Sequence, residues 1–304
     1  MRKIIVIAGP TAVGKTEYAI RVAEKFNGEI VSCDSMQLYK YMDIGSAKPT
    51  KEEQARAKHY LIDEIDPRDE FSVAVYQKMA KEYIEEIFTK GKTPIIAGGT
   101  GLYLNSLIYN MDFASPAHDN QYREKYYQMA EEDGKEAVYD ILKEKAPDIA
   151  ARIHPNNLKK VIRALETVEN DGEAIKEFAC LEEKCTDYDC MLICLNRNRE
   201  ELYDRINRRV DMLVDMGLLD EVKGLMDMGF TSQDIAMKGI GYKEIIDYFN
   251  GEYDLDRALE LVKRNTRRYA KRQITWFKRY EDMKWFNLSE DSLEDILGWI
   301  EENL

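Results

Sequence analysis

Residues 9–16 read Gly9-Pro10-Thr11-Ala12-Val13-Gly14-Lys15-Thr16, which is a complete G-x-x-x-x-G-K-[ST] phosphate-binding loop. The apolar run Ile4–Ala8 precedes the loop and the helix-forming stretch Glu17–Phe26 follows it, so the motif has the strand–loop–helix context that it needs. Its glycines let backbone N–H groups turn toward phosphate oxygens, and the start of the helix adds partial positive charge. We expect Lys15 to reach the terminal phosphate and the Thr16 hydroxyl to bind Mg²⁺. The loop predicts a bound polyphosphate and leaves open whether that ligand is ATP.

Predicted strands and helices alternate over the first third of the chain. Short apolar runs predict strands at 3–8, 29–32 and 94–97, and helices are predicted at 15–26, 51–57 and 72–90. The last of these helices repeats its apolar residues at i, i+3 and i+4. Such alternation predicts an α/β fold in which helices cover both faces of a parallel sheet, here a P-loop NTPase-like core of the nucleotide-kinase kind.

The alternation stops after Asp112. Residues 114–189 look helical and charged and contain no predicted strand, CMLICLN at 190–196 restores a strand, and the remaining residues look helical. We therefore predict an inserted all-helical domain at 114–189. It divides a P-loop core formed by 1–113 and 190–304, and this core ends in a helical C-terminal region.

The composition describes a globular protein outside the membrane. Of the 304 residues 44% are hydrophobic and 33% are charged, and no apolar run approaches the roughly 20 residues that span a bilayer. Met1-Arg2-Lys3 leads directly into the first predicted strand without an apolar signal region. We expect a cytoplasmic protein, and we expect a monomer.

Basic residues are concentrated near the end of an otherwise acidic chain. The net charge is −13, yet Lys263–Tyr280 holds eight basic residues and no acidic one. On a helix the side chains of Arg264, Arg268, Lys271 and Arg272 share a face, opposite a buried side expected at residues 261, 274 and 276. This segment is either a phosphate or nucleic-acid site, which its interleaved aromatic residues favour, or a solvated basic face.

Four of the five cysteines lie close together, at Cys180, Cys185, Cys190 and Cys194. Their spacing lacks the C-x2-C pattern of zinc sites and no histidine lies nearby. The last two belong to an apolar predicted strand, where a free thiol packs as a small apolar side chain. We interpret the group as reduced thiols without a metal.

Two further loops follow predicted strands, at the edge where an open α/β sheet binds its ligands. Residues 32–39 carry Asp34, which is either a general base or magnesium ligand, or the cap of the next helix. Residues 98–103 form a Gly-Gly-Thr-Gly turn that either lets the backbone approach a ligand or starts a helix capped by Thr100. Position alone does not decide between these roles.

Taken together, the motifs resemble the tRNA dimethylallyltransferases, also called tRNA isopentenyltransferases, of the bacterial type without a C-terminal zinc finger. The resemblance runs over nearly the whole chain, and its order is more specific than any single motif after the phosphate-binding loop. The matching segments are GPTAVGKT at 9–16, DSMQLY at 34–39, GSAKP at 45–49, HYLID at 59–63, GGTGLY at 98–103, KVIRALE at 160–166, LYDRINRRVD at 202–211, GLLDEV at 217–222, IGYKE at 240–244 and NTRRYAKRQITWFKR at 265–279. The chain departs from the family pattern at Asn157, Lys160, Lys238 and Gly239.

The resemblance implies transfer of a dimethylallyl group from dimethylallyl diphosphate to N6 of the adenosine at position 37 of tRNA, beside the anticodon, with release of diphosphate. The phosphate-binding loop then binds the diphosphate of the donor, with Mg²⁺ as the cofactor. Asp34 matches the family's general base, and the target base must leave the anticodon stack to reach it. The residues expected to contact tRNA are Asp34, Ser35, Met36, Gln37, Thr100, Arg123, Arg268 and Arg272.

The roles of two arginines are left open, and so are two alternative functions. Arg205 and Arg209 either clamp the diphosphate, as arginines do in P-loop kinases, or form ion pairs with Asp204 and Asp211 on a helix surface. An ATP-dependent kinase of a small molecule or nucleotide would explain the loop and these arginines. It would leave the Gly-Gly-Thr-Gly turn and the basic segment unexplained. The other alternative is an RNA-binding P-loop protein without catalysis.

Overall fold

The computed structural model describes residues 2–109, 111, 120–171 and 184–304. The chain forms two compact units, one made of Met1–Met111 and Lys184–Leu304 and the other of Asp112–Glu183. The insertion predicted from the sequence spans 114–189, whereas residues 184–189 belong to the larger unit.

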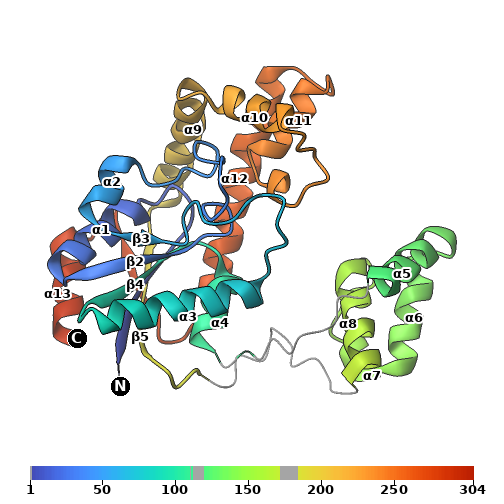
Figure 1. Cartoon of the computed structure of the whole chain (residues 1–304), viewed down its shortest axis with the longest axis horizontal. Coiled ribbons are helices and arrows are strands. Elements are labelled where there is room, and N and C mark those ends of the chain that lie inside the picture. Colours follow the sequence, from blue (N-terminus) through green and yellow to red (C-terminus); the bar gives the residue numbers. More distant parts are fainter. Residues whose placement is uncertain (1, 110, 112–119, 172–183) are drawn as a thin grey trace. The chain divides into compact units, whose positions relative to one another are not determined.

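The larger unit is built on one six-stranded sheet (Figure 1). The strands are β1 (Lys3–Ala8), β2 (Gly28–Cys33), β3 (His59–Tyr60), β4 (Thr93–Gly98), β5 (Asp189–Asn196) and β6 (Lys284–Asn287), in the order β3-β2-β4-β1-β5-β6. Every neighbouring pair is parallel. The predicted parallel α/β sheet is confirmed. The prediction that everything after residue 196 is helical is wrong, because β6 adds an edge strand there, and β3 was not predicted either.

Helices cover both faces of the sheet, because alternate side chains of each strand point to opposite sides. Ile5 and Ile7 of β1 belong to an apolar cluster with residues of α1 and α13, whereas Ile4 and Val6, equally buried, point to the other face. The helices of this unit are α1 (Lys15–Lys25), α2 (Lys51–Arg56), α3 (Val73–Thr89), α4 (Gly101–Ile108), α9 (Arg199–Asp215), α10 (Leu218–Asp227), α11 (Tyr242–Phe249), α12 (Leu255–Phe277) and α13 (Leu293–Asn303), with a short 3-10 helix at Ala236–Lys238.

Helix α12 carries the basic segment and packs with a stripe different from the one predicted. Its buried residues are Ala258, Val262, Ala270, Gln273 and Phe277. The expected stripe at residues 261, 274 and 276 is only half-buried, because the helix contacts α4, α9 and α11 along a wider face. Of these five buried residues, only Gln273 is polar.

The smaller unit is helical where it is described. It contains α5 (Asn120–Glu132), α6 (Lys135–Lys145), α7 (Pro147–Ala150) and α8 (Leu158–Asp171). Val138 and Leu142 of α6 pack with Val161 and Leu165 of α8 in a core of its own. Among the described residues of the whole chain, no helix is both long and apolar enough to cross a membrane.

Candidate active site

Four neighbouring strands deliver the predicted site to one edge of the sheet. The phosphate-binding loop leaves the end of β1, Asp34 follows β2, the Gly-Gly-Thr-Gly turn follows β4, and Arg197 follows β5. Because these strands are adjacent and parallel, their carboxyl ends meet at the same edge. That edge is where open α/β sheets bind ligands.

The phosphate-binding loop has a backbone conformation that depends on its glycines. Gly9 has a φ of 153°, and a side chain there would come within 2.5 Å of the Leu195 carbonyl oxygen on β5. Gly14, with a φ of 113°, begins α1 in the left-handed region. Ala12 adopts a φ of 63°, which is uncommon for a residue with a Cβ atom. The loop therefore leads into α1 at this edge of the sheet, where the first N–H groups of the helix lack intrahelical acceptors.

Three basic side chains hold the loop through its carbonyl groups. Lys15 Nζ donates to the Pro10 oxygen at 2.9 Å, Arg205 Nε donates to the Ala12 oxygen at 3.0 Å, and Arg197 Nε donates to the Val13 oxygen at 3.0 Å. These contacts fix the directions of three carbonyl groups of the loop. Arg197 was missed in the sequence, since a lone arginine after a strand belongs to no motif.

The charges around the loop are concentrated and partly buried. Burial lowers the pKa of Lys15 to about 8, against an opposing effect of the Asp34 carboxylate and with a further lowering by Arg209. Burial also lowers the pKa of Arg209, again opposed by Asp34. Arg209 therefore belongs to the site electrostatically, and Arg205 reaches the loop directly. A site with this much positive charge and little water favours a polyanion.

Asp34 uses only one of its two carboxylate oxygens in contacts with the turn that follows β2. Its Oδ1 accepts hydrogen bonds from the backbone N–H groups of Met36 at 2.9 Å and Gln37 at 3.4 Å, so the carboxylate does cap the turn after β2. Its Oδ2 accepts no hydrogen bond from the part of the chain that the structure describes. One carboxylate oxygen is therefore fixed by the backbone and the other is available to a substrate.

The Gly-Gly-Thr-Gly turn faces this aspartate. Thr100 Oγ1 accepts from the Ser35 N–H at 3.0 Å and lies 3.4 Å from the Ser35 hydroxyl oxygen, and it does not cap α4. Thr100 therefore stands at the N-terminal cap position of α4, as one alternative predicted, but its side chain makes no capping hydrogen bond. Tyr269 of α12 lies beside the turn, and burial together with the charge of Asp34 raises its pKa to about 12. The structure thus brings Asp34, Ser35 and Thr100 together.

Gln273 of α12 connects the phosphate-binding loop to this turn. Its Oε1 accepts from the Thr11 N–H at 2.9 Å, and its Nε2 donates to the Gly99 oxygen at 3.0 Å. The glycine at 99 is required by this contact, because a Cβ atom there would lie 2.2 Å from the amide nitrogen. Sequence reasoning missed Gln273 since it read α12 for charge. The predicted Arg268 and Arg272 are exposed on the same helix.

The loop that continues from Asp34 is held from the side of α10. The Glu221 carboxylate accepts from the N–H groups of Asp43, Ile44 and Gly45 at 2.6–2.9 Å, and from the Tyr242 hydroxyl at 2.8 Å. Within this loop the side-chain amide of Gln37 donates to the Ala47 oxygen at 3.2 Å. Lys48, almost fully buried, pairs with Asp43 and Asp63. Met36 and Gln37, which were predicted to contact tRNA, therefore lie on a loop that is held by hydrogen bonds.

In the smaller unit, the predicted tRNA contact Arg123 is engaged within that unit. Its guanidinium pairs with the buried carboxylate of Glu166, with nitrogen–oxygen distances of 2.7–3.1 Å. About a third of the Arg123 side chain remains exposed. The contact fixes the direction of the arginine and leaves part of it available.

The predicted cysteine group forms no metal site among the described residues. Cys185, Cys190 and Cys194 are free thiols, and Cys180 lies outside the described residues. Over the described part of the chain, no three His, Cys, Asp or Glu side chains gather into a metal site. The donors that do fit Mg²⁺ are the Thr16 hydroxyl at the start of α1 and the carboxylate of Asp34, both of them oxygen ligands of the kind Mg²⁺ prefers.

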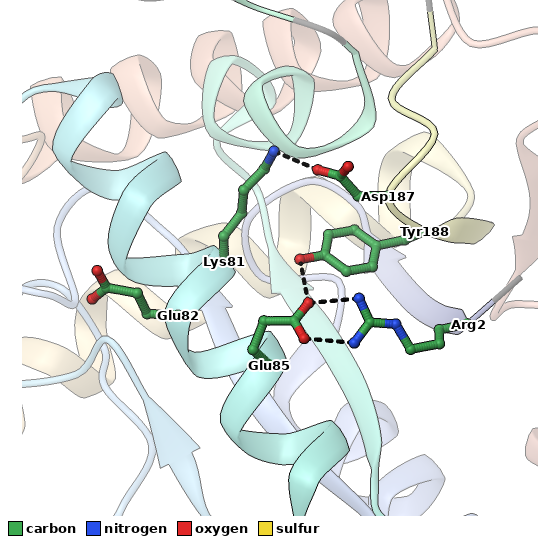
Figure 2. Close-up of a pocket in the computed structure, with 6 residues that line it drawn as sticks. All are labelled: Arg2, Lys81, Glu82, Glu85, Asp187 and Tyr188. Atoms are coloured by element: carbon green, nitrogen blue, oxygen red, sulfur yellow. Dashed lines mark hydrogen bonds and ion pairs between the residues drawn. The ribbon is translucent and has the colours of Figure 1, made fainter.

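A separate hollow of about 540 Å³ lies at the opposite edge of the sheet (Figure 2). Arg2 and Tyr188, which precede β1 and β5, both bind the Glu85 carboxylate, and Lys81 pairs with Asp187 at 2.7 Å. These charges satisfy one another at the amino ends of the strands. The hollow therefore lacks the unpaired charge that a diphosphate site needs.

Comparisons with known proteins agree with this geometry. A family model described as IPP transferase matches residues 37–280. The tRNA dimethylallyltransferase of Alkaliphilus oremlandii is 53% identical over 97% of this chain and 95% of its own, and that of Clostridioides difficile is 52% identical over the same shares. The crystal structure of the Bacillus halodurans tRNA isopentenylpyrophosphate transferase superposes with a TM-score of 0.75 at 42% identity, covering 99% and 96% of the two chains. A eukaryotic dimethylallyltransferase, described in its crystal structures as acting on tRNA, superposes with a TM-score of 0.84 at 31% identity, covering 99% of this chain and 78% of its own. The predicted P-loop NTPase-like fold is confirmed.

Proposed function

This chain belongs to the IPP transferase family, and from that premise we propose that it transfers a dimethylallyl group from dimethylallyl diphosphate to N6 of an adenosine of tRNA, at position 37, and releases diphosphate. The observation that carries the proposal is the meeting of a cationic phosphate-binding loop and the free oxygen of Asp34 at one sheet edge. A cytoplasmic location follows from the substrate.

The donor binds with its diphosphate in the loop. Lys15, Arg205, Arg209 and the first N–H groups of α1 neutralise the charge that grows on the leaving diphosphate as the carbon–oxygen bond breaks. Burial already disfavours the charge of Lys15 in the free protein, so a bound anion relieves that penalty. Thr16 would hold Mg²⁺, and the ion would supply further charge neutralisation when bound.

The acceptor is activated by Asp34. Because Oδ1 is held by two backbone N–H groups, the carboxylate keeps its direction while Oδ2 accepts a proton from the adenosine amine as the nitrogen–carbon bond forms. Thr100, whose Oγ1 accepts a hydrogen bond from the Ser35 N–H, supplies a hydroxyl group beside Asp34. Met36 and Gln37 line the space for the base on the adjoining turn.

The base must leave the stacked anticodon loop to reach this position. We propose that Arg268 and Arg272 on α12, which are exposed, bind phosphates of the stem-loop, and that the exposed part of Arg123 in the smaller unit does so too. Such contacts make binding fall with rising salt.

Mass spectrometry of tRNA incubated with the protein, Mg²⁺ and dimethylallyl diphosphate tests the proposal. We expect a gain of one dimethylallyl group on one adenosine. Asp34→Asn keeps the turn contacts and removes the base, so it should abolish turnover while stem-loop binding persists. Phosphoryl transfer from ATP without prenylation would support a kinase instead, and prenylation by Asp34→Asn at the wild-type rate would remove the assigned base.

A further inference from the structure

We propose that Gln273 is a positioning residue that sets the spacing between the donor loop and the acceptor turn. The inference rests on the proposed function and deepens it. Its side-chain amide bridges the two loops that are proposed to hold the substrates, through one acceptor contact and one donor contact.

The contacts of Gln273 are suited to this role because each end of the amide is used. Oε1 accepts a hydrogen bond from the Thr11 N–H of the donor loop, and Nε2 donates one to the carbonyl oxygen of Gly99, the residue before Thr100. Gln273 is 5% exposed, so water does not compete for either contact. A side chain with only a donor or only an acceptor satisfies one loop and leaves the other unpaired.

The surroundings of Gln273 make the bridge rigid. Gly99 and Gly101 pack against α12 so closely that a Cβ atom would lie 2.2 Å from the Gln273 amide nitrogen and 2.3 Å from the Trp276 ring. The Gly99–Gly101 turn therefore cannot approach or leave α12 without disturbing these contacts. The donor loop reaches the same helix only through Thr11 among the hydrogen bonds of the described residues. β1 and β4 hold the first residues of the two loops side by side, and removing the amide takes away the side-chain link beyond the strand ends.

Spacing of this kind acts on the chemical step. The amine and the allylic carbon are held by different loops, and a displacement of about 1 Å can cost roughly 100-fold in rate. Binding of each substrate depends on its own loop. We therefore expect the loss of Gln273 to slow the reaction of bound substrates far more than it weakens the binding of either one.

The test compares single-turnover rates at saturating dimethylallyl diphosphate and anticodon stem-loop with separately measured dissociation constants for Mg²⁺-diphosphate and the stem-loop. Gln273→Met retains volume and loses both contacts. We expect its rate to fall about 10- to 100-fold, with both dissociation constants within about threefold of wild type. Gln273→Glu keeps an acceptor for Thr11 and places an oxygen against the Gly99 carbonyl, and it should also be slow.

Thr275→Val is the matched control, because Thr275 is exposed on the same helix and bonds only within it, to the Lys271 oxygen at 3.0 Å. It should retain the wild-type rate. A wild-type rate in Gln273→Glu, or a rise in both dissociation constants that accounts for the whole loss in Gln273→Met, would overturn the inference. If the wild-type protein itself failed to prenylate the stem-loop, the proposed function would fail instead.

Discussion

The affinity for diphosphate should depend on the protonation of Lys15. The pKa of Lys15 in the free protein is lowered to about 8, mainly by burial. Its charged fraction therefore falls from about nine-tenths at pH 7 to about one-tenth at pH 9. If only charged Lys15 binds the anion, the dissociation constant for Mg²⁺-diphosphate rises ~10-fold between these pH values, or ~1.4 kcal/mol in binding free energy.

Isothermal titration calorimetry at both pH values measures this change directly. The ligand's own titration contributes as well, so Lys15→Arg is the control, since a guanidinium stays charged over the whole range. We expect the variant to lose the part of the pH dependence that comes from the lysine. If wild type and Lys15→Arg weakened in parallel, or if wild-type affinity changed less than twofold, the reasoning about the buried ammonium would be refuted.

Lys15→Met should stabilise the unliganded protein, by at most about 3 kcal/mol at neutral pH, while abolishing turnover. Because the pKa of Lys15 is lower in the folded protein, its charge destabilises the fold at pH values below about 8. The difference in denaturant midpoint between the variant and wild type should therefore shrink as pH rises above 8 and disappear near 10.5. Glu221→Gln turns an NH₂ group toward backbone N–H donors, so it should lower the free energy of unfolding by about 1–3 kcal/mol, measured by thermal unfolding, and raise KM for tRNA. The control is Asp220→Asn, because Asp220 is exposed in the same helical turn. Gly98→Ala would put a Cβ atom 2.1 Å from a carbonyl oxygen on β2, so it should destabilise the protein by about 1–3 kcal/mol or more. Gly224→Ala, in open space on α10, is the control and should be neutral or stabilising. Equal denaturation midpoints for the two variants would contradict the close strand contact.

Much of the fold follows from local pattern. The apolar run before the phosphate-binding loop and the Gly-Gly-Thr-Gly turn each identified a strand end, and the parallel arrangement then required their loops to meet. The short strands could not be found in this way. β3 has two residues, and β6 lies in the polar sequence around Trp285, so both become strands only by pairing with the edges of a sheet already formed.

The site was predictable where a residue belongs to a motif and not where it acts through tertiary contact. Asp34 and Lys15 were found from their loops. Arg197 and Gln273 hold loops that lie 184 and 262 residues away along the chain, and no spacing rule connects such positions. The pairing of Arg123 with a buried carboxylate had no local signal either, because Glu166 lies on another helix.

The place of β1 in the sheet has a consequence for biosynthesis. The strand lies between β4 and β5, and its residues Lys3–Ala8 pair along one side with a segment that begins only at Asp189. While the ribosome makes the intervening residues, one edge of the most apolar strand has no partner. Nascent chains with bare strand edges associate readily. The edge of β1 that faces β5 can therefore be paired only after residues 189–196 have emerged, so the sheet around the phosphate-binding loop is completed late although the loop is among the first parts to be synthesised.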